Sequence, residues 1–267
     1  MVPILLAAAV LAASPAARAC PVERLVPPAS PPGPGSPGGE AESRLGVVFA
    51  GGGAKAAYEA GVALALHERG LAPAVVAGTS SGAINAAFLA AGEAERLAGL
   101  WRGLRRSDVY GIRGPAVLGG LLPGFLALPT WGGSSGLLDP APLRHTLSRQ
   151  VDLDRIRASP VRLLVVATDL RTGTARRFDN ATLSVDALVA SASVPGLFPA
   201  VSLNGDLLVD GGVVQRAPVL ELLGAHRVDR LLVVSAYESD PPRALTARAG
   251  LERAFELALT REAMNVG

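Results

Sequence analysis

From residue 44 onward, short apolar runs alternate with longer stretches of helical periodicity, and this alternation limits the possible folds more than any other feature. Apolar runs of this length are typical of buried strands. Strands separated by helices form a mostly parallel sheet that is covered on both faces. The sequence therefore predicts an α/β fold with a central, mostly parallel sheet flanked by helices. Hydrophobic residues make up 49% of the chain and charged residues 18%, which suffices for such a core.

The pattern predicts one domain over residues 44–267, without internal repeats. The expected strands are Leu45–Ala50, Ala74–Ala77, Val161–Thr168 and Arg230–Ala236, with a hairpin over Asn204-Gly205 within Val201–Val209. The expected helices are Ala54–Arg69, Ala83–Ala91, Ala94–Leu104, Pro142–Gln150 and Ala247–Ala263. Residues Gly111–Leu138 are rich in Gly, Pro and Leu and predict no particular element.

Two segments precede this domain. Residues 1–19 carry the apolar run Met1–Ala13, which is shorter than the about 20 residues that span a bilayer, and end in a small-residue cleavage pattern. We expect a signal peptide here, although no Lys or Arg precedes the apolar run; the alternative is a buried N-terminal helix. Residues 20–43 hold seven of the 21 prolines and predict an extended linker.

Export leaves two destinations open. Cys20 stands where a bacterial lipoprotein carries its lipidated cysteine, but Ala17 and Arg18 fit that motif imperfectly. We therefore expect an exported protein that is either secreted or periplasmic, or lipid-anchored to a bacterial membrane through Cys20. The linker would then hold the domain away from the membrane surface.

Charge and cysteine content exclude several classes of protein. With 25 basic and 23 acidic side chains, the net charge of +2 gives no reason to expect a nucleic-acid partner. The single cysteine excludes an intramolecular disulfide and a cysteine-based zinc cluster. No group of acidic residues or histidines has the spacing of metal ligands, so we expect no metal. We also expect no cofactor.

The pentapeptide Gly78-Thr79-Ser80-Ser81-Gly82 fits the pattern G-x-S-x-G. In that pattern a nucleophilic serine occupies a strained strand-to-helix turn, and the flanking glycines let neighbouring segments pass closely. Gly132–Gly136 also fits, with Ser134 at its centre. Ser80 is favoured because an expected strand precedes it and an expected helix follows it, whereas Ser134 lies in the unassigned region.

Two further glycine motifs stand at strand ends. Gly51-Gly52-Gly53 follows the first strand and offers backbone amides for an oxyanion or a phosphate. A dinucleotide site is disfavoured because residues 71–81 lack the acidic residue that such a site needs. Asp210-Gly211-Gly212 closes the expected hairpin, and Asp210 is either a buried general base or an ordinary turn residue.

Taken in this order, the three motifs resemble those of the patatin-like phospholipase family: a Gly-rich loop ending in Lys55, a G-x-S-x-G elbow and a D-G-G motif. Further stretches are similar to the family: Tyr58–Gly61, Gly136–Asp139, Pro142–Arg144, Ala167–Leu170 with Gly173, Ala190–Pro195 and Phe198-Pro199. The resemblance runs from about Leu45 to Ala236. One departure is Ala56, where the family usually has Gly.

The resemblance implies a three-layer α/β/α fold and a serine lipid acyl hydrolase similar to phospholipase A or lysophospholipase. Ser80 would be the nucleophile and Asp210 its base. The oxyanion hole would use Gly51, Gly52, Gly53 and Ser81. Residues expected to support these motifs are Lys55, Gly78, Gly82, Gly211 and Gly212. The implied partners are a phospholipid or another acyl-ester lipid and a membrane surface.

Two alternatives remain at this point. The chain order Ser80, Asp210, His226 also suits the catalytic triad of an α/β-hydrolase esterase, while His67 and His145 are expected on helix surfaces. The other alternative is an inactive patatin-like domain that binds lipid without cleaving it. The presence of both Ser80 and Asp210 argues against that alternative.

Overall fold

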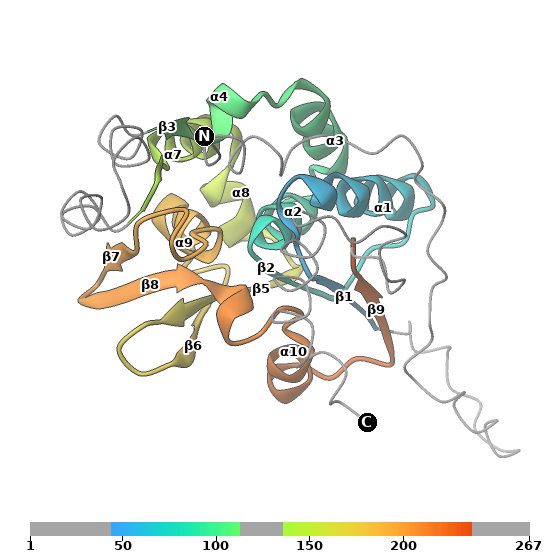
Figure 1. The fold of residues 1–267 in the computed structure, drawn as a ribbon. Helices are drawn as coiled ribbons and strands as arrows, with labels where there is room; N and C mark the ends of the chain where they lie inside the picture. Colours follow the sequence, from blue (N-terminus) through green and yellow to red (C-terminus); the bar gives the residue numbers. More distant parts are fainter. Residues whose placement is uncertain (1–43, 113–135, 237–267) are drawn as a thin grey trace, which may run out of the picture.

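The computed structural model describes residues 44–112 and 136–236 (Figure 1). The expected signal peptide 1–19, the linker 20–43 with Cys20, Ser134 and the expected helix Ala247–Ala263 lie outside these residues.

A mixed sheet of seven strands forms the centre of the described chain, in the order β7-β8-β5-β2-β1-β9, with β6 also paired to β5. Its strands are β1 (Leu45–Phe49), β2 (Val75–Thr79), β5 (Arg162–Asp169), β6 (Thr174–Phe178), β7 (Val201–Leu203), β8 (Asp206–Asp210) and β9 (Arg230–Val234). Strands β9, β1, β2 and β5 pair in parallel, whereas β6, β8 and β7 are antiparallel to their neighbours. A short ribbon pairs β3 (Gly111–Ile112) with β4 (Leu138–Asp139).

The helices are α1 (Ala57–Glu68), α2 (Ser81–Ala90), α3 (Ala94–Gly103), α4 (Arg106–Val109), α7 (Ala141–Gln150), α8 (Leu153–Ala158), α9 (Val185–Ser191) and α10 (Val219–Ala225). Two 3-10 helices, η2 (Gly53–Ala56) and η3 (Gly211–Val213), follow strand ends. Figure 1 shows α10 on one side of the sheet and α1, α2 and α9 on the other.

Both faces of the parallel strands are buried. Alternate residues of β5 divide between them: Val165 packs in the core with α1, α2 and α9, while Val166 packs with Leu222 of α10. This explains why these strands are continuous apolar runs. All ten residues of α2 are buried, so the helix after Ser80 lies in the interior and is apolar around most of its circumference.

The expected fold class is confirmed. Each expected strand and helix that falls on described residues is present within a few residues of its expected bounds, and Asn204 and Gly205 both have the positive φ of the expected hairpin turn. The sequence did not predict the short elements β6, α8, α9 and α10, nor the extent of antiparallel pairing beside β5. Within the unassigned stretch, the described ends form β3 and β4.

Candidate active site

Ser80 occupies the sharp turn between β2 and α2. Its backbone has φ 60° and ψ −134°, a strained conformation for a residue with a Cβ. Close backbone packing surrounds the turn: a Cβ added at Gly78 would lie 2.2 Å from the Gly82 carbonyl oxygen, and one at Gly82 would lie 2.5 Å from the Phe49 oxygen. The glycines are therefore required, and the half-buried Ser80 stands at the N-terminus of a buried helix.

A hydroxyl from α9 holds the turn in place. The backbone N–H of Ser80 donates to Ser191 Oγ at 3.0 Å, and Ser191 Oγ donates to the Val166 carbonyl oxygen at 2.6 Å. Ser191 is fully buried. Its single hydroxyl thus connects the nucleophile turn to the neighbouring strand β5.

Strand pairing brings Asp210 to the same level along the strands as Ser80. Thr79, the residue before Ser80, pairs with Val166 of β5, and Asp210 pairs with the next residue, Ala167. A Cβ on Gly211 would lie 2.2 Å from the Val166 oxygen and 2.9 Å from Thr79 Cγ2. Gly211 therefore lets the end of β8 pack directly against the end of β2, beside Ser80.

The Asp210 carboxyl is buried and only partly hydrogen-bonded. Its Oδ1 accepts from the Gly212 N–H at 2.8 Å, while the buried Oδ2 has no well-formed hydrogen bond within the described residues. Burial raises the pKa of Asp210 to about 6, and the nearby Ser80 hydroxyl, the Gly212 amide and the charge of Arg216 oppose that rise. A carboxylate of this kind is a stronger base than an exposed one and remains ionised at neutral pH.

The glycine loop packs against the Ser80 turn. Gly51, Gly52 and Gly53 have φ values of 73°, 133° and 59°, all of them favourable for glycine alone. A Cβ added at Gly51 would lie 2.4 Å from the Thr79 oxygen and 3.1 Å from Ser80 Cβ. The first residue of the loop therefore packs directly against the turn that carries Ser80.

One expected oxyanion donor needs correction. The Gly51 N–H donates to Glu59 Oε1 at 2.7 Å in a buried contact, so this amide is already occupied. The predicted roles of Gly52, Gly53 and Ser81 stay predictions; Ser81 is the first residue of α2, whose N–H has no acceptor within its own helix. Lys55 is exposed in η2.

Glu59 and its partners were not predicted as site residues. Glu59 is fully buried, and Asn85 Nδ2 donates to its Oε2 at 2.9 Å. Burial raises the pKa of Glu59 to about 8, against the opposing hydrogen bonds from Asn85, Gly51 and Ala50. The sequence signal was available: Glu59 is the one charged residue within the apolar run from Ala57 to Leu66.

The structure contradicts the histidine triad. His226 follows α10, and its pKa is lowered by partial burial and by the charge of Arg162, the first residue of β5. Ser80 follows the last residue of β2, so the two residues lie at opposite ends of the parallel strands. Five strand residues span roughly 16 Å, far beyond hydrogen-bond reach.

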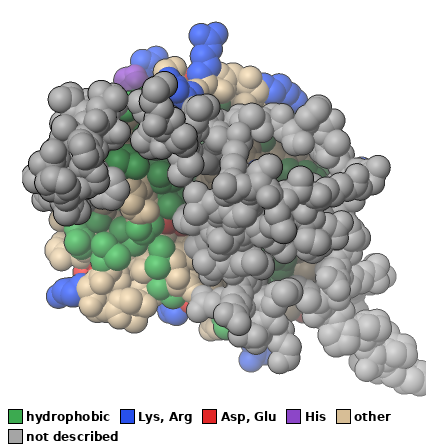
Figure 2. Space-filling view, viewed as in Figure 1, with side chains coloured by type: hydrophobic (Ala, Val, Ile, Leu, Met, Phe, Trp, Pro, Cys, Tyr) green, Lys and Arg blue, Asp and Glu red, His purple; other side chains and the backbone are tan. Residues whose placement is uncertain are grey.

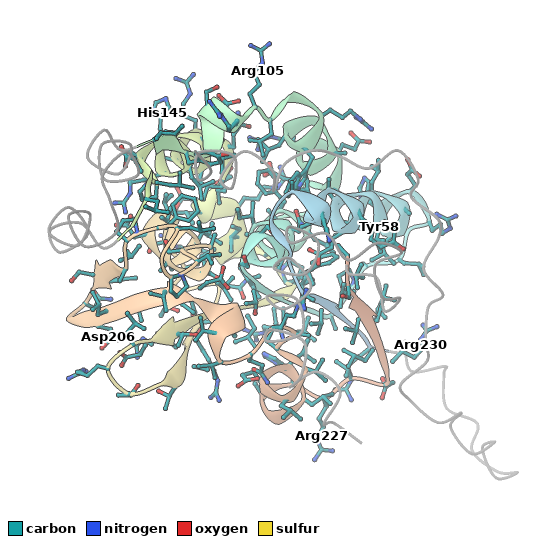
Figure 3. The ribbon with its side chains drawn as sticks, viewed as in Figure 1. Tyr58, Arg105, His145, Asp206, Arg227 and Arg230 are labelled. Atoms are coloured by element: carbon teal, nitrogen blue, oxygen red, sulfur yellow. The ribbon has the colours of Figure 1, made fainter. Side chains whose placement is uncertain are left out.

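The other two histidines are also away from the site. His67 is exposed near the end of α1 and His145 is exposed on α7. Figure 3 shows His145 at the top of the view and Arg227, the neighbour of His226, at the bottom.

In residues 44–112 and 136–236, no three His, Cys, Asp or Glu side chains are grouped so that they could hold a metal ion. None of the described helices is long and apolar enough to cross a membrane.

Exposed apolar side chains lie on two segments, one of which directly follows Asp210. Val213 is 47% exposed three residues after Asp210, and Leu137 is 37% exposed beside Gly136, which bridges to Gly196 after α9. Figure 2 shows hydrophobic side chains, in green, gathered on the visible face of the described chain.

Comparison with known proteins supports the assignment suggested by these motifs. Uncharacterised NTE family proteins of Mycobacterium bovis and Mycobacterium tuberculosis are 26% identical over 227 residues, which are 85% of this chain and 56% of theirs. The chain thus spans about half the length of the curated relatives it matches. VipD from Legionella pneumophila shares the fold, with a TM-score of 0.50 and 18% identity over 80% of this chain and 53% of VipD. The patatin-like phospholipase family profile matches residues 47–223, more than half of the chain. The chain therefore belongs to the patatin-like phospholipase family.

Proposed function

We propose that this protein hydrolyses carboxylic esters of lipids, as a phospholipase A or lysophospholipase does, with Ser80 and Asp210 as a catalytic dyad. The observation that carries the proposal is the buried Asp210 carboxyl, whose Oδ2 lacks a full hydrogen bond while the Ser80 hydroxyl is near enough to lower its pKa. A base in this position can accept one proton, and the adjacent hydroxyl can supply it.

In the proposed reaction, Ser80 Oγ attacks the ester carbonyl carbon while its proton passes to Asp210. The carbonyl oxygen becomes an oxyanion, which the amides of Gly52, Gly53 and Ser81 stabilise. Collapse of this intermediate breaks the bond to the alcohol, which leaves with the proton from Asp210. Water then attacks the acyl-Ser80 ester and gives a proton to Asp210; the bond between the acyl group and Ser80 Oγ breaks, Asp210 returns the proton to Ser80 Oγ, and the fatty acid is released.

A lipid substrate is supported by family membership and by the exposed apolar side chain of Val213, three residues after Asp210. Such a side chain suits an acyl chain better than a polar substrate. We also propose export, with secretion, periplasmic residence or lipid anchoring at Cys20 as its outcomes. Loss of detergent-phase partitioning in Cys20→Ser would support the anchor, and an unmodified mature Cys20 N-terminus found by mass spectrometry would contradict it.

The test of the activity uses purified protein with phosphatidylcholine vesicles, lysophosphatidylcholine and a soluble short-chain nitrophenyl ester. We expect release of free fatty acid, and we expect it to persist in excess EDTA because the proposed dyad needs no metal. Ser80→Ala is the matched control for a contaminating hydrolase. No turnover of any of these esters by folded wild-type protein would contradict the proposal.

A further inference from the structure

Glu59 is a fully buried carboxyl group that the proposed reaction does not use. Its two oxygens have different partners: Oε1 accepts from Gly51 N at 2.7 Å, and Oε2 accepts from Asn85 Nδ2 at 2.9 Å. Burying an ionisable group is costly unless its partners satisfy it. Gly51 N and Asn85 Nδ2 are both donors, so they favour the carboxylate form against the burial that raises the pKa of Glu59, and Gly51 supplies the first amide of the glycine loop.

The orientation of the Asn85 amide is fixed by its contacts with Ala56 and Trp101. Asn85 Nδ2 also donates to the Ala56 carbonyl oxygen at 3.0 Å, and Asn85 Oδ1 accepts from Trp101 Nε1 at 2.8 Å. The indole N–H is only a donor, so it requires the oxygen of Asn85 to face Trp101 and the NH₂ group to face Glu59. A chain of hydrogen bonds therefore runs from Trp101 on α3, through Asn85 on α2 and Glu59 on α1, to Gly51.

We propose that Glu59 is a positioning residue that fixes the glycine loop beside Ser80, and that Asn85 and Trp101 hold it in place. By accepting the Gly51 N–H, the carboxylate takes this amide out of oxyanion binding. It also holds the loop in the conformation in which the following amides, those of Gly52 and Gly53, serve the oxyanion. The inference rests on the proposed function, since the oxyanion exists only when Ser80 attacks an ester.

The pair of donors explains why a carboxylate is needed. Gln has the same shape as Glu but offers one oxygen and one NH₂ group, so Glu59→Gln turns an N–H toward either Gly51 N or Asn85 Nδ2. One of the two hydrogen bonds is then lost, so the side chain at position 59 no longer connects Asn85 to the loop.

The experiment measures kcat and KM on the soluble short-chain ester. Glu59→Gln is expected to lower kcat by roughly ten- to a hundredfold and to leave KM within about twofold. This loss of kcat is smaller than the loss expected when an oxyanion donor is removed outright.

The matched control is Glu93→Gln. Glu93 is another buried acid, located between α2 and α3, and it pairs with Arg96. This control should keep kcat within about twofold of wild type even where it lowers stability, since Glu93 does not contact the loop.

Two results would overturn the inference: unchanged kcat in Glu59→Gln, or the same kcat loss in Glu93→Gln. Should Glu59→Gln fail to fold, Trp101→Phe removes the donor to Asn85 together with part of the ring, and an unchanged kcat there refutes the proposal. Inactive wild-type protein refutes the proposed function as well. If the wild type is active and Glu59→Gln leaves kcat unchanged, only this inference is refuted.

Discussion

The parallel strands β9, β1, β2 and β5 and the antiparallel strands β8 and β7 bring their residues to the candidate site in different ways. Ser80 depends on a local structure, because a strand, a turn with two obligatory glycines and a helix lie within about 15 consecutive residues. Asp210 arrives 130 residues later, on a strand that reverses direction after the Asn204-Gly205 turn and pairs with the end of β5.

The end of α9 and the residues that follow it join these two regions. Ser191 Oγ accepts the N–H of Ser80, and the Ser193 carbonyl oxygen accepts the N–H of Asp210 at 2.9 Å. Two residues of one short segment therefore hold the backbone of both candidate catalytic residues. The comparison shows that the nucleophile turn is defined locally, whereas the distance between nucleophile and base depends on tertiary structure.

The largest expected effect is the loss of the nucleophile from the parallel region. Ser80→Ala should reduce ester hydrolysis by at least about 10³-fold, because no other group can form the acyl intermediate. Initial rates on the soluble ester measure this loss. Ser134→Ala is the control and should retain wild-type rates; the opposite pattern would move the nucleophile to Ser134.

Removal of the base from the antiparallel region should have nearly as large an effect. Asp210→Asn is isosteric but accepts no proton from Ser80, so we expect kcat to fall by about 10³-fold. His226→Ala is expected to change kcat by less than about twofold. An inactive but folded His226→Ala variant would contradict the dyad.

The wild-type pH profile provides a second test of Asp210. The carboxylate form is the base, and burial raises its pKa to about 6, so kcat should rise with pH through about 6. A histidine base gives an acid limb in the same range. The variants Asp210→Asn and His226→Ala therefore distinguish the two bases. The pH profile tests only whether kcat falls at acidic pH.

Ser191→Ala should weaken the connection between the two regions. The substitution leaves the Ser80 N–H and the Val166 carbonyl oxygen without this partner, at a cost of about 1–3 kcal/mol in the free energy of unfolding. We expect kcat to fall about tenfold as the turn shifts relative to Asp210. Urea denaturation and steady-state kinetics measure the two effects. Ser193→Ala removes only a hydroxyl bond to Val189 and should affect kcat much less.

A different kind of expected effect is a change of stability with pH. The pKa of Glu59 is raised from 4.5 to about 8 and that of Asp210 from 3.8 to about 6. Because both folded-state values lie above the unfolded ones, the native state binds more protons in this interval, and the free energy of unfolding should fall as the pH rises from about 4 to about 8. Thermal unfolding at several pH values checks the sign, and Glu59→Gln should flatten the slope.

Much of the fold could be predicted because the parallel strands are apolar on both faces and the hairpin carries an Asn-Gly turn. Strand β6 could not, since its sequence TARRF is largely exposed and lacks an apolar face. Helices α9 and α10 have seven residues each, too few for a helical period to stand out from an apolar run.

The candidate site likewise contains residues that the sequence predicts and contacts that it does not. Ser80 and the glycines of its turn could be predicted, because their backbone conformations are tied to particular residue types. The occupied Gly51 amide, the Ser191 hydroxyl and the partners of Glu59 could not. Each depends on a side chain from a distant element reaching one backbone atom, and the sequence does not specify such a contact.

The most direct test of the central claim is covalent labelling of wild-type protein with a fluorophosphonate, followed by peptide mapping with mass spectrometry. The account predicts one phosphonylated serine, Ser80, with labelling slowed strongly in Asp210→Asn and little in His226→Ala. Modification of Ser134 or another serine in place of Ser80, or equal labelling rates in wild type and Asp210→Asn, would contradict it.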